Sequence, residues 1–139
     1  MTYALDASAI IAHLDARDAH HDAVAAVLDG VDGETLLAHP LTIAECLVAA
    51  VREQRATEMV EAIGAMRVEP AGDDAGSPLR LAQLRVATGL RMPDCCALDT
   101  ARQNRATFVT FDERQVTAAR RLGVAVEPSA PGSADPPVG

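Results

Sequence analysis

Four carboxylates, Asp6, Glu45, Asp94 and Asp112, are the side chains in this chain that could do chemistry together. Without a cation, each pair about 4 Å apart would repel by about 1 kcal/mol in water and by about 4 kcal/mol at an effective dielectric of about 20. A divalent metal removes that repulsion, and an all-oxygen ligand set favours Mg²⁺ or Mn²⁺ over Zn²⁺. Two such ions suit in-line hydrolysis of a phosphodiester, so these residue types indicate nuclease chemistry.

The elements that would position these acids are short apolar segments alternating with longer helical ones. The expected strands are Tyr3–Leu5, Leu36–Leu37, Arg67–Glu69, Thr107–Thr110 and Val124–Glu127. Helices are expected from Ser8 to about Leu14 and over Asp18–Leu28, Thr42–Gln54, Ala56–Met66, Ser77–Gly89, Pro93–Asn104 and Asp112–Gly123. This alternation predicts an α/β fold with a small parallel sheet of about five strands and helices on both faces.

Such a fold would bring the acids together, because ligand sites in open parallel sheets lie outside the carboxyl ends of the strands. Asp6 closes the first strand, and Asp112 follows the fourth strand by two residues. Asp94 begins the helix that leads into the fourth strand, and Glu45 lies in the first turn of the helix after the second strand. We therefore expect all four carboxylates at one edge of the sheet.

Each acid also has a purely structural interpretation. Asp and Glu favour helix N-termini because they interact with the helix dipole. Glu45 could be the partner of Thr42 in a capping box, and Asp112 could be an N-cap. Ser8 could likewise cap the first helix.

The composition excludes several enzyme classes. The chain has 139 residues and no lysine, which rules out a P-loop or a Schiff base. Its net charge of -8 has the wrong sign for a protein that coats nucleic acid without specificity, although arginine is available for phosphate contacts. One domain is expected over residues 1–128, followed by a Pro-, Gly- and Ser-rich tail at 129–139 that we expect to be disordered.

Localisation can be predicted from the same features. No uncharged run approaches the length of a membrane-spanning helix, and the N-terminus lacks the basic and apolar regions of a signal peptide. Three cysteines, Cys46, Cys95 and Cys96, make a poor disulfide framework because their number is odd and two are adjacent. We expect a cytoplasmic protein with reduced thiols and no attachment to a membrane.

Four segments that contain the acids follow one another along the chain, namely Tyr3–Ala9, Leu41–Glu45, Met92–Asp94 and Phe108–Asp112. In this order and on these elements they resemble the PIN-domain ribonucleases, most closely the VapC-type toxins of bacterial toxin–antitoxin pairs, over about residues 1–128. The resemblance implies that Asp6, Glu45, Asp94 and Asp112 are catalytic and hold Mg²⁺ or Mn²⁺, with Ser8 and Thr110 as supporting polar groups.

The resemblance also implies a function and partners. The chain would be a metal-dependent endoribonuclease that hydrolyses RNA and acts as the toxin of a VapBC-type pair, with a VapB-like antitoxin and a homodimeric state. A PIN-type nuclease of RNA processing without an antitoxin is one alternative, and a catalytically silent binding module is another. A phosphoacceptor receiver domain also clusters acids at strand ends, but the absence of lysine counts against it.

Several other residues are expected at solvent-exposed or core positions and not in the site. Asp99 points about 140° away from Asp94 on a helix, so we expect it at the solvated rim of the site. His20 and His21 are expected on an exposed helix face. The apolar residues of the helices expected at Thr42–Gln54 and Ala56–Met66 could form a core or an interface, and a core is the simpler expectation. The arginines that border the expected site are Arg80, Arg85, Arg91, Arg102 and Arg114.

Overall fold

Five short strands form one parallel sheet in the order β3-β2-β1-β4-β5. The computed structural model describes residues 1–128, and the expected tail at 129–139 lies outside the described residues. The strands are β1 (Thr2–Leu5), β2 (Thr35–Ala38), β3 (Val68–Pro70), β4 (Thr107–Val109) and β5 (Val126–Glu127). Because the first strand lies at the centre, the chain crosses over it to add β4, and the carboxyl ends of β1 and β4 become neighbours.

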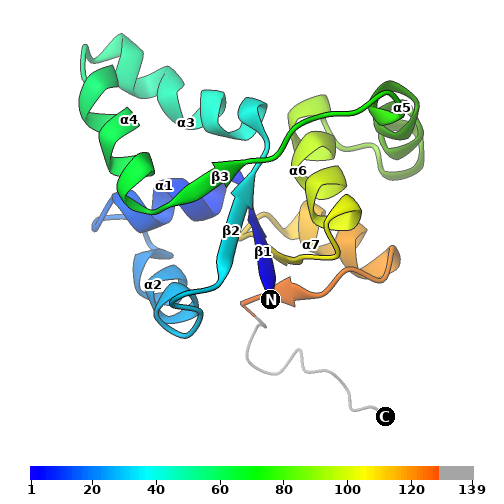
Figure 1. Cartoon of the computed structure of the whole chain (residues 1–139), viewed down its shortest axis with the longest axis horizontal. Helices are drawn as coiled ribbons and strands as arrows, with labels where there is room; N and C mark the ends of the chain where they lie inside the picture. Colours follow the sequence, from blue (N-terminus) through cyan, green and yellow to red (C-terminus); the bar gives the residue numbers. More distant parts are fainter. Residues whose placement is uncertain (129–139) are drawn as a thin grey trace.

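Helices cover both faces of this sheet, which confirms the α/β class and the parallel arrangement (Figure 1). They are α1 (Ala7–Leu14), α2 (His21–Asp29), α3 (Pro40–Arg52), α4 (Ala56–Ala65), α5 (Ser77–Thr88), α6 (Met92–Gln103) and α7 (Glu113–Arg121). The helices α1 to α4 share one core with the sheet, and α5 to α7 share the other.

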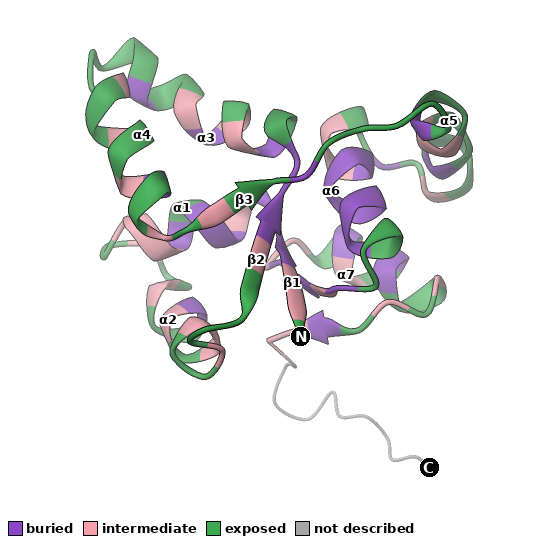
Figure 2. Cartoon of the chain, viewed as in Figure 1, coloured by how far each residue is buried: buried purple, intermediate pink, exposed green. Residues whose placement is uncertain are grey.

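The two cores follow from the alternation of side chains along the central strands. Ala4 and Phe108 belong to the core with α5 to α7, whereas the next residues, Leu5 and Val109, belong to the core with α1 to α4. All four side chains are almost completely buried. The central strands are therefore apolar on both faces, and they are largely buried between the helices (Figure 2).

The helix α6 is the most deeply buried helix of the described chain. Every residue from Cys95 to Ala101 is buried. The preceding turn contains Gly89 in the left-handed conformation, with φ of 72°, and Pro93 then starts the new helix at a position where no amide hydrogen is needed. This turn fixes where Asp94, in the first turn of α6, meets the end of the sheet.

The expected capping box at the start of α3 is wrong. The helix α3 begins at Pro40, earlier than predicted, and its N-cap is His39, whose Nδ1 accepts from the amide of Leu41. Thr42 is buried inside the first turn, so no capping box pairs it with Glu45. The sequence-based prediction began this helix at Thr42, but proline is well suited to a first helical turn.

The cysteine prediction is confirmed, since Cys46, Cys95 and Cys96 are all buried free thiols. Burial raises the pKa of Cys46 to about 12 and that of Cys96 to about 11, which keeps both protonated and unreactive. Among residues 1–128, none of the helices combines the length and the apolar character that crossing a lipid bilayer requires.

Candidate active site

Asp6 is the centre of the candidate site. It follows β1 directly and is the N-cap of α1, with 2% of its surface exposed. Its Oδ1 accepts hydrogen bonds from the Ser8 hydroxyl at 2.7 Å and from the Ala9 amide at 2.9 Å. Its Oδ2 accepts from the Thr110 hydroxyl and from Nε2 of Gln115, the latter at 3.0 Å. The carboxylate is held by four donors from three separate elements or their ends.

The electrostatic state of Asp6 reflects a balance between burial and these donors. Burial raises the pKa of the Asp6 carboxyl above its ordinary value of 3.8. The hydrogen bonds from Thr110, Ser8 and Ala9 oppose this effect, and the negative charge of Asp112 adds to it. Asp112 and Asp6 lie at the same end of the sheet, because the Asp112 amide donates to the Thr110 hydroxyl that donates to Asp6.

Asp94 is linked to Asp6 by a residue that the sequence analysis missed. Nε2 of Gln115, on α7, donates to Asp6 Oδ2 and also to Asp94 Oδ1, the latter at 3.3 Å. Gln115 is 3% exposed. A signal for it existed, because Gln115 stands three residues before Ala118 and four before Ala119, on the buried side of the helix that Asp112 caps.

Glu45 and Asp94 are linked by a cation, Arg91. Its guanidinium lies 3.6 Å from Glu45 Oε2 and 3.5 Å from Asp94 Oδ2. Burial raises the pKa of Glu45, with Arg91 lowering it and Asp94 raising it. The Arg91 side chain is 67% exposed, so it covers the two carboxylates from the solvent side.

Asp112 is both a helix cap and a neighbour of the site. Its Oδ1 accepts from the amides of Arg114 and Gln115, and this confirms the structural interpretation of Asp112 as the N-cap of α7. Its own amide donates to the Thr110 hydroxyl, which in turn donates to Asp6. The N-cap role occupies one carboxylate oxygen and does not remove the residue from the site.

The two hydroxyls that were predicted to support the site both donate to Asp6. Ser8 donates to Asp6 and accepts from the amide of Phe111, so it ties the start of α1 to the end of β4. The N-cap of α1 is Asp6, and the alternative that Ser8 caps this helix is wrong. Thr110 is 1% exposed and makes the equivalent connection from β4.

The donor set fits a hard divalent cation, although the carboxylates are not gathered around one point. Among the described residues, no group of three or more His, Cys, Asp or Glu side chains is close enough to hold a metal ion as it stands. Nitrogen atoms of Gln115 and Arg91 lie instead between the carboxylate pairs. Carboxylate oxygens are the ligands that hard divalent cations such as Mg²⁺ and Mn²⁺ prefer.

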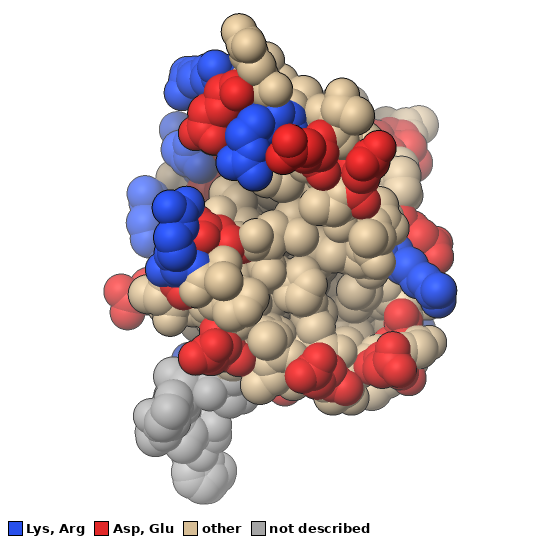
Figure 3. All heavy atoms as spheres, turned by 90° about the vertical axis from the view of Figure 1, so that its left-hand side faces the viewer, with Lys and Arg blue, Asp and Glu red and all other residues tan. Residues whose placement is uncertain are grey.

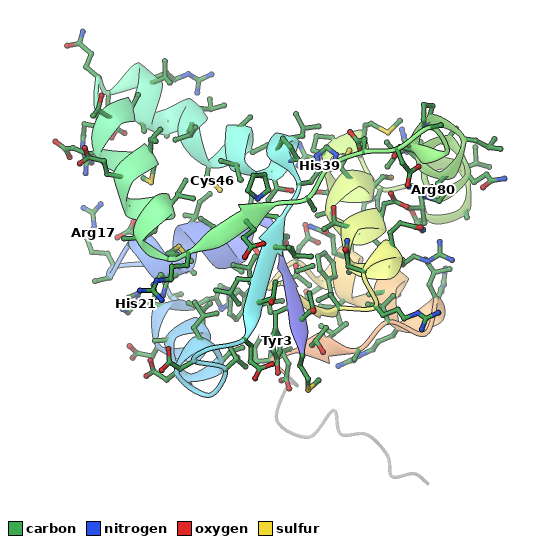
Figure 4. All side chains as sticks on the ribbon, in the orientation of Figure 1. Tyr3, Arg17, His21, His39, Cys46 and Arg80 are labelled. Carbon is green, nitrogen blue, oxygen red and sulfur yellow. The ribbon has the colours of Figure 1, made fainter. Side chains whose placement is uncertain are left out.

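Asp99 does not lie at a solvated rim. It is 5% exposed and forms a two-point contact with Arg80 of α5, with Nε to Oδ1 at 3.0 Å and Nη2 to Oδ2 at 3.2 Å. Figure 4 labels Arg80 beside α5. Asp99 lies on a different face of α6 from Asp94, as the helical rotation predicted. That face packs against α5 and not against water. Asp99 and Arg80 therefore form a structural ion pair.

The adjacent histidines behave differently from each other. His20 is exposed and its ring stacks on Phe111 with 4.4 Å between centroids. His21 is half-buried, and its Nδ1 lies 2.8 Å from the carbonyl oxygen of Ala12. Both connect α2 to neighbouring elements, so the expected exposed face is correct for His20 alone.

A cavity of about 980 Å³ lies beside the acids and not over them. Thr110, Phe111, Val27 and Arg120 help to line it between α2 and α7. None of the four acids is part of its wall. The four acids therefore lie outside this cavity, at the end of the sheet.

Comparisons with known proteins agree with this geometry. The PIN domain family matches residues 3–121, most of the chain, so the chain belongs to the PIN domain family. A comparison with curated proteins finds no match. Several solved structures share the fold.

Three of these structures illustrate the likeness. VapBC2 from Rickettsia felis, bound to a DNA fragment from its promoter, has 16% identity and a TM-score of 0.71, covering 91% of this chain and 98% of that chain. VapC20 from Mycobacterium tuberculosis, a sarcin–ricin loop cleaving toxin, has 14% identity and a TM-score of 0.70, covering 85% and 95%. VapBC-1 from nontypeable Haemophilus influenzae has 18% identity and a TM-score of 0.70, covering 91% and 97%.

Proposed function

We propose that this PIN domain is a metal-dependent endoribonuclease that acts as the toxin of a VapBC-type toxin–antitoxin pair. The observation that carries the proposal is the linked chain of carboxylates, in which Gln115 joins Asp6 to Asp94 and Arg91 joins Asp94 to Glu45. Asp112 is coupled to the same group through Thr110. Family membership and the likeness to toxin structures support the same function.

Some residues of this site would bind the metal, and others would orient the ligands. We propose Asp6, Glu45, Asp94 and Asp112 as ligands for Mg²⁺ or Mn²⁺. When bound, the metal relieves negative charge at the scissile phosphate and lowers the cost of deprotonating the attacking water. Ser8 and Thr110 orient the Asp6 carboxylate from two sides, because each hydroxyl is itself fixed by a backbone amide.

Arg91 is the arginine best placed to contact the RNA backbone. Of the five arginines that border the site, it is the one whose guanidinium contacts two of the four acids while remaining 67% exposed. Arg80 is instead committed to Asp99 and Asp74. A guanidinium at the mouth of an acidic site can form charge-assisted contacts with a phosphate.

An exposed apolar face offers a place for an antitoxin. Ile11 of α1, Val48 and Val51 of α3 and Val60 of α4 are between 42% and 61% exposed. These helices lie on the side of the molecule that Figure 3 faces, where a broad area free of charged side chains is bordered by acidic and basic ones. We propose that an apolar segment of a VapB-like antitoxin covers this face, as antitoxins accompany the toxins in solved VapBC complexes.

The sequence-based expectation of a core here is correct only in part. Ile63 is buried, and Ile43, Leu47 and Met59 are half-buried and pack against the same core, whereas Val51 and Val60 are exposed. The homodimer implied by the family resemblance stays a prediction, and sedimentation of the purified protein would test it.

The nuclease proposal is tested by incubating a mixed RNA pool with the purified protein in Mg²⁺, in Mn²⁺ and in EDTA. We expect cleavage in one or both metals, none in EDTA and none by Asp94→Asn in any condition. Glu61→Gln, an exposed change on α4, is the matched control and should cleave normally. Absence of cleavage by the folded protein in both metals would favour the catalytically silent binding module.

A further inference from the structure

Asp6 has no free acceptor position left for a metal ion. An ionised carboxylate has about four lone-pair sites on its two oxygens. Ser8 and Ala9 use those of Oδ1, while Thr110 and Gln115 use those of Oδ2. If Asp6 is to ligate a cation, one of the four donors has to leave.

Three of the four donors are fixed by the backbone. The Ala9 amide belongs to the first turn of α1, which Asp6 caps. The Ser8 hydroxyl accepts from the Phe111 amide at 3.0 Å, and the Thr110 hydroxyl accepts from the Asp112 amide at 3.1 Å. Moving either hydroxyl would break its second hydrogen bond, and moving the Ala9 amide would disrupt the first turn of α1.

Gln115 differs from the other three donors. Its Nε2 serves two carboxylates at once, Asp6 and Asp94, as a cation placed between them would. Its Oε1 is buried and has no hydrogen-bond partner, so rotation of the amide breaks no bond at the oxygen. Amide oxygens are also ligands that Mg²⁺ accepts, whereas an amide N–H₂ directed at a cation is repelled.

We infer that Gln115 is a placeholder for the cation, whose amide nitrogen bridges Asp6 and Asp94 in the metal-free protein and leaves them when a divalent ion binds. The inference rests on the proposed metal-dependent function and assigns Gln115 a positioning role in it. The placeholder stabilises the buried Asp6 and the partly buried Asp94 carboxylates without metal, and it makes metal binding compete with two hydrogen bonds to carboxylates.

Metal binding measured without RNA tests this assignment. Mn²⁺ affinity by calorimetry and the melting temperature without metal would be compared for the parent protein, Gln115→Met and Gln115→Glu. Gln103→Met, an exposed change at the end of α6, is the matched control. For Gln115→Met we expect about tenfold tighter Mn²⁺ binding, because the competing hydrogen bonds are gone, together with a lower melting temperature without metal.

Gln115→Glu should move both quantities further in the same directions, since it adds a third carboxylate of the same shape. Should either variant fail to fold without metal, refolding with Mn²⁺ restores it if the placeholder account holds. Unchanged or weaker Mn²⁺ binding by folded Gln115→Met would overturn it, and weaker binding would show that Gln115 supports the ligands in both states.

A direct readout comes from the side-chain amides of the unmodified protein. The chain holds four glutamines and one asparagine, so few such signals exist in a nitrogen-15 correlation spectrum. Mg²⁺ should shift the Gln115 amide protons strongly and speed their exchange with water, leaving the Gln103 signal in place. If Mg²⁺ and Mn²⁺ bind but the Gln115 signal does not respond, the placeholder is wrong and the nuclease proposal stands. If neither ion binds, both are wrong.

Discussion

At the scale of single residues, Asp6 shows how burial and hydrogen bonding compete at this site. Its pKa lies above 3.8 because burial outweighs the donors from Thr110, Ser8 and Ala9. Between 3.8 and that raised value, the folded protein keeps a proton that the unfolded chain has lost. The contribution of Asp6 to stability is therefore fully present below pH 3.8 and is lost as the pH rises through the folded-state pKa.

Replacing Asp6 with Asn should remove this loss. We expect Asp6→Asn, without metal, to lose less melting temperature than the parent protein between low and neutral pH, because Asn does not titrate. Its NH₂ replaces one acceptor oxygen, so two of the four donors lose their acceptor and the variant should melt below the parent protein at low pH. It should also lose stabilisation by Mg²⁺. Thermal unfolding across pH, with and without Mg²⁺, measures these effects, and the same fall in melting temperature in both proteins would contradict a raised pKa of Asp6.

The acids at the strand ends could be predicted from sequence, but the residues between them could not. Asp6 and Asp112 were found because strand boundaries are local features and parallel strands end at a common edge. Gln115 was missed because its partners are 109 and 21 residues away in the chain. Its contacts depend on how α7 packs on the sheet, which no local pattern specifies.

At the scale of elements, the burial of α6 decides what its side chains do. Asp94 lies at the exposed start of this helix, while Asp99 is enclosed by α5 further along. The helical rotation separated the two acids correctly, but the burial of Asp99 required knowledge of the α5 packing and of Arg80 as its counter-ion. Asp94 therefore belongs to the candidate site, whereas Asp99 stabilises the packing of α5 on α6.

This difference predicts different outcomes for substitutions on the same helix. Asp99→Ala should cost about 2 kcal/mol of unfolding free energy, since it removes two hydrogen bonds to a guanidinium. Asp99→Asn, which keeps one acceptor, should lose less. Urea denaturation measures the loss, and RNA cleavage below the melting temperature should be normal for both. Loss of cleavage by folded Asp99→Asn would place this residue in the active site.

At the scale of the whole molecule, the charge distribution separates substrate binding from partner binding. The net charge is -8, and the four site acids contribute half of that excess. A cation at the site would thus be needed before RNA could approach closely. The apolar face on α1, α3 and α4 lies apart from this requirement, and it is where an antitoxin would gain affinity by burying apolar surface.

Val60 offers a test of that separation. Val60→Asp, at a position that is 54% exposed on α4, should weaken binding of a cognate antitoxin at least tenfold while leaving RNA cleavage unchanged. Glu61→Gln on the same helix is the control. Co-purification of the toxin with the small protein encoded beside it, followed by titration, measures the effect. Equal antitoxin affinity in both variants would move the interface elsewhere.

The most direct test of the account is the rate of RNA cleavage in Mg²⁺ by four single variants, Asp6→Asn, Glu45→Gln, Asp94→Asn and Asp112→Asn, with Glu61→Gln as the control. Each variant is first shown to be folded. If the four carboxylates form one metal site, every one of the four should lose at least a hundredfold in rate, and the control should match the parent protein. Full cleavage by folded Asp94→Asn or Asp6→Asn would contradict the account, because the reaction would then occur at another site.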